Sequence, residues 1–201
     1  ASLGELFVND AFGTAHRAHA STEGVAHHLP SCAGLLIEKE VSFFAPILQN
    51  PAKPMVAVIG GAKVSSKIGV LESILPNCAT MIIGGGMAYT FLKAQGFEIG
   101  KSLFEAEYLD TAKQFLQAAE KAGVQVVLPV DHLVADEFSE DAPALPINGQ
   151  DIPEDKLAMD IGAKTIDMCK KALAGAETIV WNGPMGVFEF KQFSEGTRIV
   201  A

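Results

Sequence analysis

The 201-residue sequence lacks the features of a membrane-spanning, disulfide-stapled or zinc-binding protein. Its longest apolar runs, Met55–Ile59 and Thr80–Ile83, have the length of a strand, far below the ~20 apolar residues that span a bilayer. Its three cysteines, Cys32, Cys78 and Cys169, lie far apart without a C-x-x-C pair, so neither zinc nor a disulfide framework is expected. We expect buried or partly buried free thiols in a reducing compartment.

Positive charge is also scarce, with 15 lysines and arginines against 24 aspartates and glutamates. Residues 131–160 hold nine carboxylates and a single lysine, Lys156, and we interpret this stretch as a solvated hairpin and loop. No basic patch is available to nucleic acid or to an anionic membrane, so neither partner is expected. No signal peptide is visible, and the chain begins without methionine and ends within a helical pattern, so we expect a fragment of a longer protein.

What the sequence does contain is an alternation of apolar runs and helical patterns, which is typical of βα units on a parallel sheet. Strands are predicted at residues 6–9, 55–59, 80–83, 124–128 and 178–181, and helices at 38–48, 64–75, 87–93, 105–121 and 163–173. The fold class is therefore α/β, and the helix at 38–48 is the expected linker between two parts.

Three of the predicted strands end in turns of small residues: Gly60-Gly61, Gly84-Gly85-Gly86 and Asn182-Gly183-Pro184. Any one of these could reflect tight-turn geometry alone. Ligands of open α/β sheets bind beyond the carboxyl ends of the strands, and glycine lets a ligand approach the backbone closely. Three such turns in the same topological position favour a ligand cleft.

The first turn continues into two lysines, Lys63 and Lys67. A strand, a glycine turn and a helix N-terminus favour an anion such as phosphate, and lysines four residues apart would share one helical face. Two solvated lysines are the alternative. The spacing is not that of a Walker A loop, and the third glycine of a dinucleotide fingerprint is missing from residues 84–89.

Arg17 and Glu189 are further candidates outside the lysine turn. Arg17 is one of two arginines and follows the predicted strand at 6–9 beside His16, where its guanidinium could hold a phosphate or carboxylate. An ordinary surface arginine is the alternative. Glu189 follows an apolar pair, where it could accept hydrogen bonds from ribose hydroxyls or could be a cap or a surface acid.

Six segments together resemble phosphoglycerate kinase: FVNDAFGTAHRAHAST, GGAKVSSKI, GGGMAYTFL, LPVDHLVADEF, MDIGAKT and WNGPMGVFE, in the family's order. The resemblance implies a Rossmann-like parallel sheet sandwiched by helices, in a two-domain kinase architecture truncated at both ends. Residues 1–33 would be a remnant of the N-terminal 3-phosphoglycerate-binding domain. Residues 34–50 would be the interdomain linker helix, and residues 51–201 an incomplete C-terminal nucleotide-binding domain.

The resemblance also implies reversible phosphoryl transfer between 1,3-bisphosphoglycerate and ADP, giving 3-phosphoglycerate and ATP in glycolysis. It implies a cytoplasmic monomer that uses Mg²⁺ with ADP or ATP. Lys67, Lys63 and Arg17 are the implied catalytic residues, and Arg17 and His16 would bind the substrate. The implied nucleotide-binding residues are Gly61, Ala62, Lys63, Lys67, Gly85, Gly86, Asp160, Ile161, Gly162, Asn182 and Glu189. Phosphoryl transfer requires the protein to position the two substrates and to supply positive charge, and it requires little covalent chemistry from the protein.

The sequence also departs from the family pattern. Segments like DLNVP and HLGRP are missing, as are a GGGD-like motif with the metal-linked aspartate and an STGGG-like loop; Ala163 stands where proline is common. We therefore expect no metal ligand in this chain, because the expected aspartate would lie beyond its C-terminal end, and no activity from the chain alone. The alternative is a non-catalytic nucleotide-binding module. A nicotinamide dehydrogenase is disfavoured because no acidic residue follows Thr80–Ile83.

Overall fold

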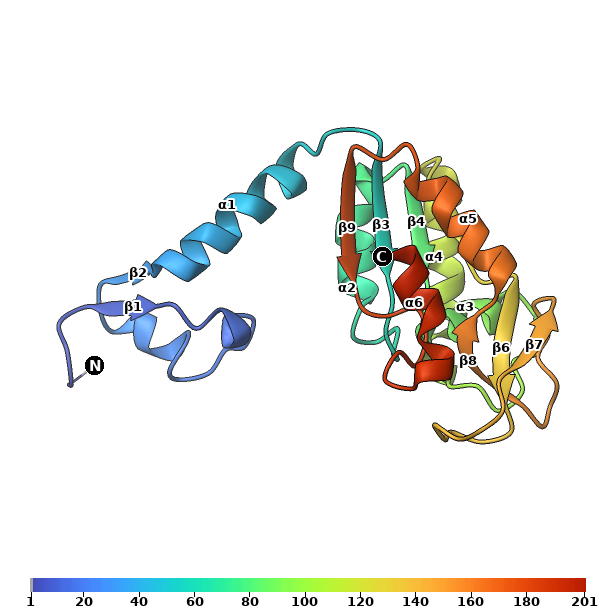
Figure 1. The fold of residues 1–201 in the computed structure, drawn as a ribbon. Helices are drawn as coiled ribbons and strands as arrows, with labels where there is room; N and C mark the ends of the chain where they lie inside the picture. Colours follow the sequence, from blue (N-terminus) through green and yellow to red (C-terminus); the bar gives the residue numbers. More distant parts are fainter. Residues whose placement is uncertain (1) are drawn as a thin grey trace. The chain divides into compact units, whose positions relative to one another are not determined.

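A computed structural model describes residues 2–201. The chain divides after Pro51 into two compact units, the second of which is Ala52–Ala201. The first unit contains strands β1 (Phe7–Asn9) and β2 (Ser31–Ala33), which pair in parallel, and helix α1 (Leu35–Gln49), all blue in Figure 1. Two short 3-10 helices, Phe12–Thr14 and Gly24–His27, join the strands. The expected division into 1–33, 34–50 and 51–201 stays a prediction.

Helix α1 begins where a distant side chain satisfies its first turn. The carboxylate of Asp10 accepts a hydrogen bond from the backbone N–H of Ile37 at 2.9 Å, and a carboxylate is favoured at a helix N-terminus. Burial in this unit is sparse, because Thr22, Gly34 and Pro51 are the three buried residues among those described. Most of the stability of the described chain must therefore come from the second unit.

The second unit is built on a parallel four-stranded sheet with the order β5-β4-β3-β9. Its strands are β3 (Met55–Ile59), β4 (Thr80–Ile83), β5 (Gln125–Val127) and β9 (Thr178–Asn182). Every residue of β3 and β4 is buried, as expected for central strands covered on both faces. The predicted α/β class is confirmed, and so are the predicted bounds of these two strands.

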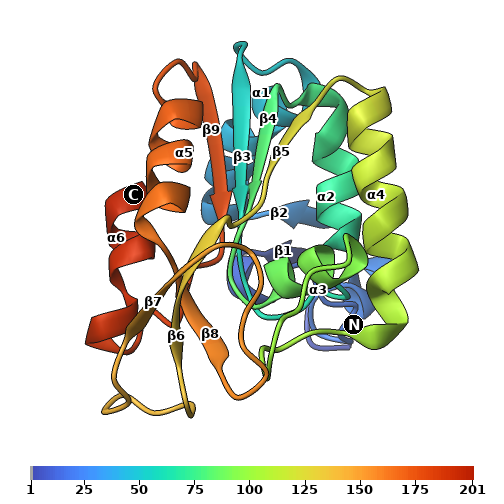
Figure 2. The same cartoon turned by 90° about the vertical axis from the view of Figure 1, so that its right-hand side faces the viewer.

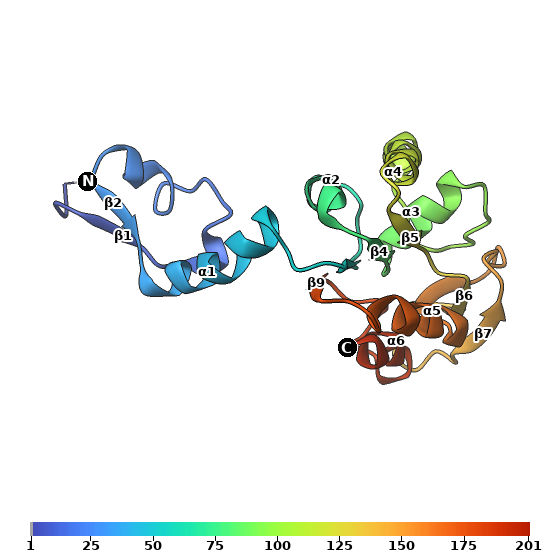
Figure 3. The same cartoon turned by 90° about the horizontal axis from the view of Figure 1, so that it is seen from above.

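Helices cover both faces of this sheet. Figures 2 and 3 show α2 (Ile68–Ile74), α3 (Met87–Ala94) and α4 (Leu109–Lys121) on one side, with α5 (Ala163–Leu173) and α6 (Glu195–Val200) on the other. The predicted bounds of α5 are confirmed, whereas α4 starts later than predicted because residues 106–108 form a 3-10 turn. Within residues 2–201, no helix has the length and apolar character needed to cross a bilayer.

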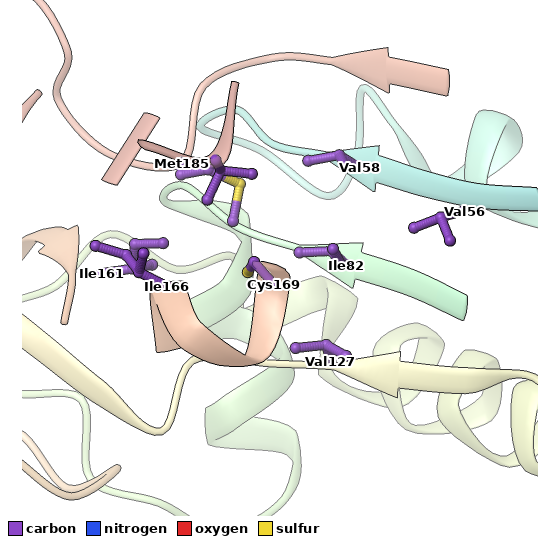
Figure 4. Close-up of a cluster of buried hydrophobic side chains, with 9 residues drawn as sticks. Val56, Val58, Ile82, Val127, Ile161, Ile166, Cys169 and Met185 are labelled. Carbon is purple, nitrogen blue, oxygen red and sulfur yellow. The ribbon is translucent and has the colours of Figure 1, made fainter. Parts of the chain in front are cut away.

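Buried apolar side chains cover both faces of the sheet, and one cluster of them lies between the sheet and α5. Figure 4 shows Val58 and Ile82 of the sheet facing Cys169 of α5 and Met185 of the loop after β9, and all four are buried. Burying such side chains stabilises the fold by about 1.5–3 kcal/mol each. The prediction of buried thiols is confirmed for Cys78 and Cys169 and is wrong for Cys32, which is exposed.

The acidic stretch forms a second, antiparallel sheet with the order β7-β6-β8, comprising β6 (Asp131–Ala135), β7 (Leu145–Asn148) and β8 (Leu157–Ile161). The interpretation of the stretch as solvated is wrong for two of its acids, since Asp131 is 4% and Asp160 1% exposed. Asp131 accepts the N–H groups of Lys164 and Thr165, each at 2.8 Å, at the start of α5. These hydrogen bonds offset the cost of burying a carboxylate.

Candidate functional site

A cavity of about 260 Å³ lies where β3, β4 and β9 end. Its lining has two parts, which we call the backbone wall and the side-chain wall. The backbone wall consists of the strand-end turns, and its members are Gly61, Ala62, Gly85, Gly86, Pro184, Met185 and Gly186. The side-chain wall is largely apolar, and its members are Tyr89, Leu103, Phe138, Leu157, Ala158, Met159 and Val187. Glu189 also lines the cavity, so a ligand there meets backbone on one side and apolar groups on the other.

The turns of the backbone wall are hydrogen-bonded to one another. Gly85 N–H donates to the carbonyl of Met185 at 2.9 Å, and the N–H of Met87 donates to the carbonyl of Gly61 at 3.0 Å. Gly85 has φ +67°, and a Cβ there would lie 2.6 Å from both N and O of Gly61. Glycine is thus needed for the turns to pack against one another. This need exists whether or not a ligand binds.

The lysine turn differs from its sequence prediction. Helix α2 begins at Ile68, four residues later than predicted, and residues 64–67 form a turn in which Val64 O accepts from Lys67 N at 2.8 Å. Lys63 and Lys67 therefore do not share a helical face. Lys67 Nζ donates to Asn182 Oδ1 at the end of β9, and a Cβ on Gly61 would lie 3.8 Å from Lys67 Cε. The Lys67 side chain consequently runs along the edge of the cavity.

Asn182 stands beside the single tryptophan of the chain, Trp181. The indole Nε1–H of Trp181 donates to the carbonyl of Gly183 at 2.6 Å, and the N–H of Gly60 donates to the carbonyl of Asn182 at 2.8 Å. These contacts join the turn after β9 to the end of β3. They fix the position from which Asn182 reaches Lys67.

Asp160, Ile161 and Gly162 lie behind the cavity lining. Asp160 Oδ2 accepts from Gly196 N at 2.7 Å and its Oδ1 from Ile161 N at 2.9 Å, while burial raises the pKa of Asp160 to about 6. Ile161 is buried, and a Cβ on Gly162 would lie 2.3 Å from Asp131 Cγ. Their nucleotide contacts stay a prediction, since none of the three lines the cavity.

Several lining residues escaped the sequence analysis. Leu157 and Ala158 precede the MDIGAKT segment on β8 and Met159 begins it, and the sequence offers no local sign of which strand residues face a cavity. Phe138 carried a usable signal, because it is a large aromatic residue within an acidic loop and it is 65% exposed. Exposed apolar groups of this kind often mark a binding site when they lie together.

Arg17 and His16 belong to the first unit, so their substrate roles stay a prediction. Both side chains are exposed, and Arg17 Nε donates to His16 Nε2 at 3.3 Å. Among residues 2–201, no group of three or more His, Cys, Asp or Glu side chains is placed to hold a metal ion. A larger, open depression of about 920 Å³ runs along α4 and β5, and no glycine turn is among its described lining residues.

Comparison with known proteins adds independent information. The family model described as phosphoglycerate kinase matches residues 1–201. Phosphoglycerate kinases of Borrelia turicatae (strain 91E135) and Koribacter versatilis (strain Ellin345) are 58% and 59% identical, with 98% and 100% of this chain and 50% of each relative covered. The solved phosphoglycerate kinase of Coxiella burnetii has a TM-score of 0.88 at 52% identity, covering 98% of this chain and 51% of that one. The chain spans about half the length of the curated relatives it matches.

Proposed function

The chain belongs to the phosphoglycerate kinase family, and on that premise we propose that its cavity holds the nucleotide of a phosphoglycerate kinase. The parent protein would transfer a phosphoryl group reversibly between 1,3-bisphosphoglycerate and ADP. The observation that supports this most strongly is the cavity at the carboxyl ends of three parallel strands with Lys67 along its edge. Nucleotides bind to α/β sheets at this edge.

The proposed roles follow from the chemistry of each wall. The apolar side-chain wall suits the base, and the exposed carboxylate of Glu189 suits the ribose hydroxyls. Lys67, with Lys63 on the same turn, supplies positive charge for the phosphates and for the phosphoryl group during transfer. The acceptor of the forward reaction is already an anionic phosphate, so no general base is required of the protein.

The remaining parts of the proposal concern the partners. Mg²⁺ would enter with ADP or ATP and neutralise phosphate charge, and the described residues form no carboxylate cluster that fits the ion. Arg17 and His16 would contact 3-phosphoglycerate or 1,3-bisphosphoglycerate from the first unit. We further propose that the parent protein is a cytoplasmic monomer.

Replacing Lys67 by alanine tests the nucleotide site. The variant is expected to bind ADP and ATP about tenfold more weakly, because it loses one charge-assisted contact with phosphate. Isothermal titration calorimetry on the 201-residue chain measures this. Lys121→Ala removes a lysine from the far end of α4 and is the matched control, expected to bind as the unchanged chain does. If the Lys67→Ala variant bound ADP and ATP with the same affinity as the unchanged chain, that result would count against the role given to Lys67.

The chain alone is expected to show no measurable turnover, because it spans about half the length of its relatives and transfer requires both substrates held in line. An assay that follows ATP formation checks this, with a full-length relative as the positive control. Robust turnover would contradict the expectation. The alternative, a non-catalytic nucleotide-binding module, is favoured if the parent protein lacks the DLNVP-like and GGGD-like segments.

A further inference from the structure

Glu105 lies outside the cavity lining and contacts the turn that carries both lysines. Its Oε2 accepts from the backbone N–H of Ser65 at 2.9 Å, and its Oε1 accepts from the Ser65 hydroxyl at 2.6 Å. Both carboxylate oxygens are thereby directed at one residue that is 40 positions away in the sequence. Such two-point contacts fix geometry as well as adding energy.

The backbone of Glu105 is itself anchored. Its N–H donates to the hydroxyl of Thr90 at 3.0 Å, and Thr90 is 1% exposed within α3. Helix α3 starts directly after Gly86 of the backbone wall. A continuous path of contacts therefore leads from the glycine turns through α3 and Glu105 to the lysine turn.

The charge state of Glu105 fits this arrangement. Slight burial acts to raise its pKa, but the hydrogen bonds from Ser65 and Val64 and the charge of Lys63 outweigh burial and lower the pKa. The carboxylate is therefore ionised at neutral pH. Exposed ion pairs contribute little by themselves, so the effect of Glu105 must come from where it holds the turn.

We propose that Glu105 is a positioning residue for the nucleotide site. By holding Ser65 of the lysine turn, it sets where Lys63 and Lys67 lie relative to the glycine turns. This inference rests on the proposed nucleotide-binding function. Lys67 is then fixed from two directions, by Asn182 at its ammonium group and by Glu105 through its own backbone turn.

Glu105→Gln tests the proposal, because glutamine keeps the size of the side chain but has one acceptor oxygen in place of two. ADP binding is expected to weaken about threefold to tenfold, with adenosine binding unchanged, since the lysines contact only phosphate. Removing a negative charge near the lysines without moving them would instead tighten ADP binding. Tighter or unchanged ADP binding therefore overturns the proposal.

Two further variants sharpen the test. Glu107→Gln removes the same charge from an exposed residue of the neighbouring turn and is expected to leave ADP affinity unchanged. Ser65→Ala removes the hydroxyl that Glu105 accepts from, so the Ser65→Ala, Glu105→Gln double variant should lose less than the sum of the single losses. Additive losses would mean that Glu105 does not act through Ser65.

Amide hydrogen exchange separates failure of the inference from failure of the proposed function. The N–H groups of Lys67 and Ile68 both donate to Val64 O, so their exchange reports on closure of the turn. Exchange should be faster in Glu105→Gln than in Glu107→Gln, whether or not nucleotide binds. If the unchanged chain binds no ADP, the proposed function fails, and equal exchange in the two variants overturns the positioning role.

Discussion

Replacing His132 by phenylalanine is expected to stabilise the Ala52–Ala201 unit by about 1–3 kcal/mol at pH 7, because buried polar atoms without hydrogen bonds are costly. His132 is 1% exposed, and neither ring nitrogen makes a hydrogen bond of acceptable geometry within residues 2–201. Its ring lies against Tyr89 with centroids 5.6 Å apart, so a phenyl group fits the same aromatic contact.

The gain should increase as the pH falls. Burial lowers the pKa of His132 from 6.5 to about 4, although the Gln150 backbone and the charge of Asp131 act in the opposite direction. The unfolded chain therefore takes up a proton near pH 6.5 that the folded chain resists until about pH 4, so the wild-type protein loses stability across that window. Removing the imidazole should add on the order of 3 kcal/mol to the difference by pH 4.

Urea denaturation at pH 7, 6 and 5 measures this difference. Asp160 has its pKa raised to about 6, so its contribution runs the other way, with stability lost as the pH rises from 3.8 towards 6. Asp160 is present in both proteins, so subtracting one curve from the other isolates His132. His28→Phe changes an exposed histidine and should give no gain. A difference that stays constant with pH would show that His132 does not titrate as expected.

Gly85→Ala is expected to cost about 2–4 kcal/mol of stability, because it combines a strained backbone conformation with overpacking. Gly85 has φ +67°, and its added Cβ would lie 2.6 Å from the backbone of Gly61 and 2.9 Å from the carbonyl oxygen of Pro184. These neighbours are main-chain atoms of hydrogen-bonded turns, which cannot rotate away. ADP binding should also be lost, since the displaced turns form the backbone wall.

Gly123→Ala separates the two causes. Gly123 has φ +70°, close to that of Gly85, but an added Cβ would have no heavy atom within 4 Å. Its cost should be limited to the conformational part, about 1 kcal/mol. Thermal or urea denaturation of both variants gives the comparison. Equal costs would show that close packing of the glycine turns contributes nothing measurable.

The sequence predicted those parts of the fold that depend on local pattern. Met55–Ile59 and Thr80–Ile83 are continuous apolar runs, and Ala163–Leu173 has helical spacing, so their bounds were predicted correctly. The start of α2 was not, because residues 64–67 are held as a turn by Glu105, which lies 40 positions from Ser65. No local pattern carries a contact of that range.

Long-range contacts also explain why the sequence did not predict the burial of Asp131 and Asp160 or the side-chain wall of the cavity. Asp131 is buried where it accepts hydrogen bonds from the start of α5, more than 30 residues away, and its apolar sequence neighbours do not indicate that contact. Leu103 reaches the cavity from a segment with no recognisable motif, and Phe138 ends the LPVDHLVADEF segment, which gives no local sign that this side chain lines a cavity. The glycine turns were identifiable because their chemistry is local, whereas the side-chain wall is assembled by tertiary contacts.

The position of Trp181 gives the protein an intrinsic optical reporter. It is the single tryptophan of the chain, it directly precedes the residue that holds Lys67, and its indole N–H bonds to the turn of the neighbouring Gly183. Indole emission depends on the polarity and hydrogen bonding around the ring. Fluorescence titration can therefore follow events at the end of β9 without any attached dye, with the signal arising from one known place.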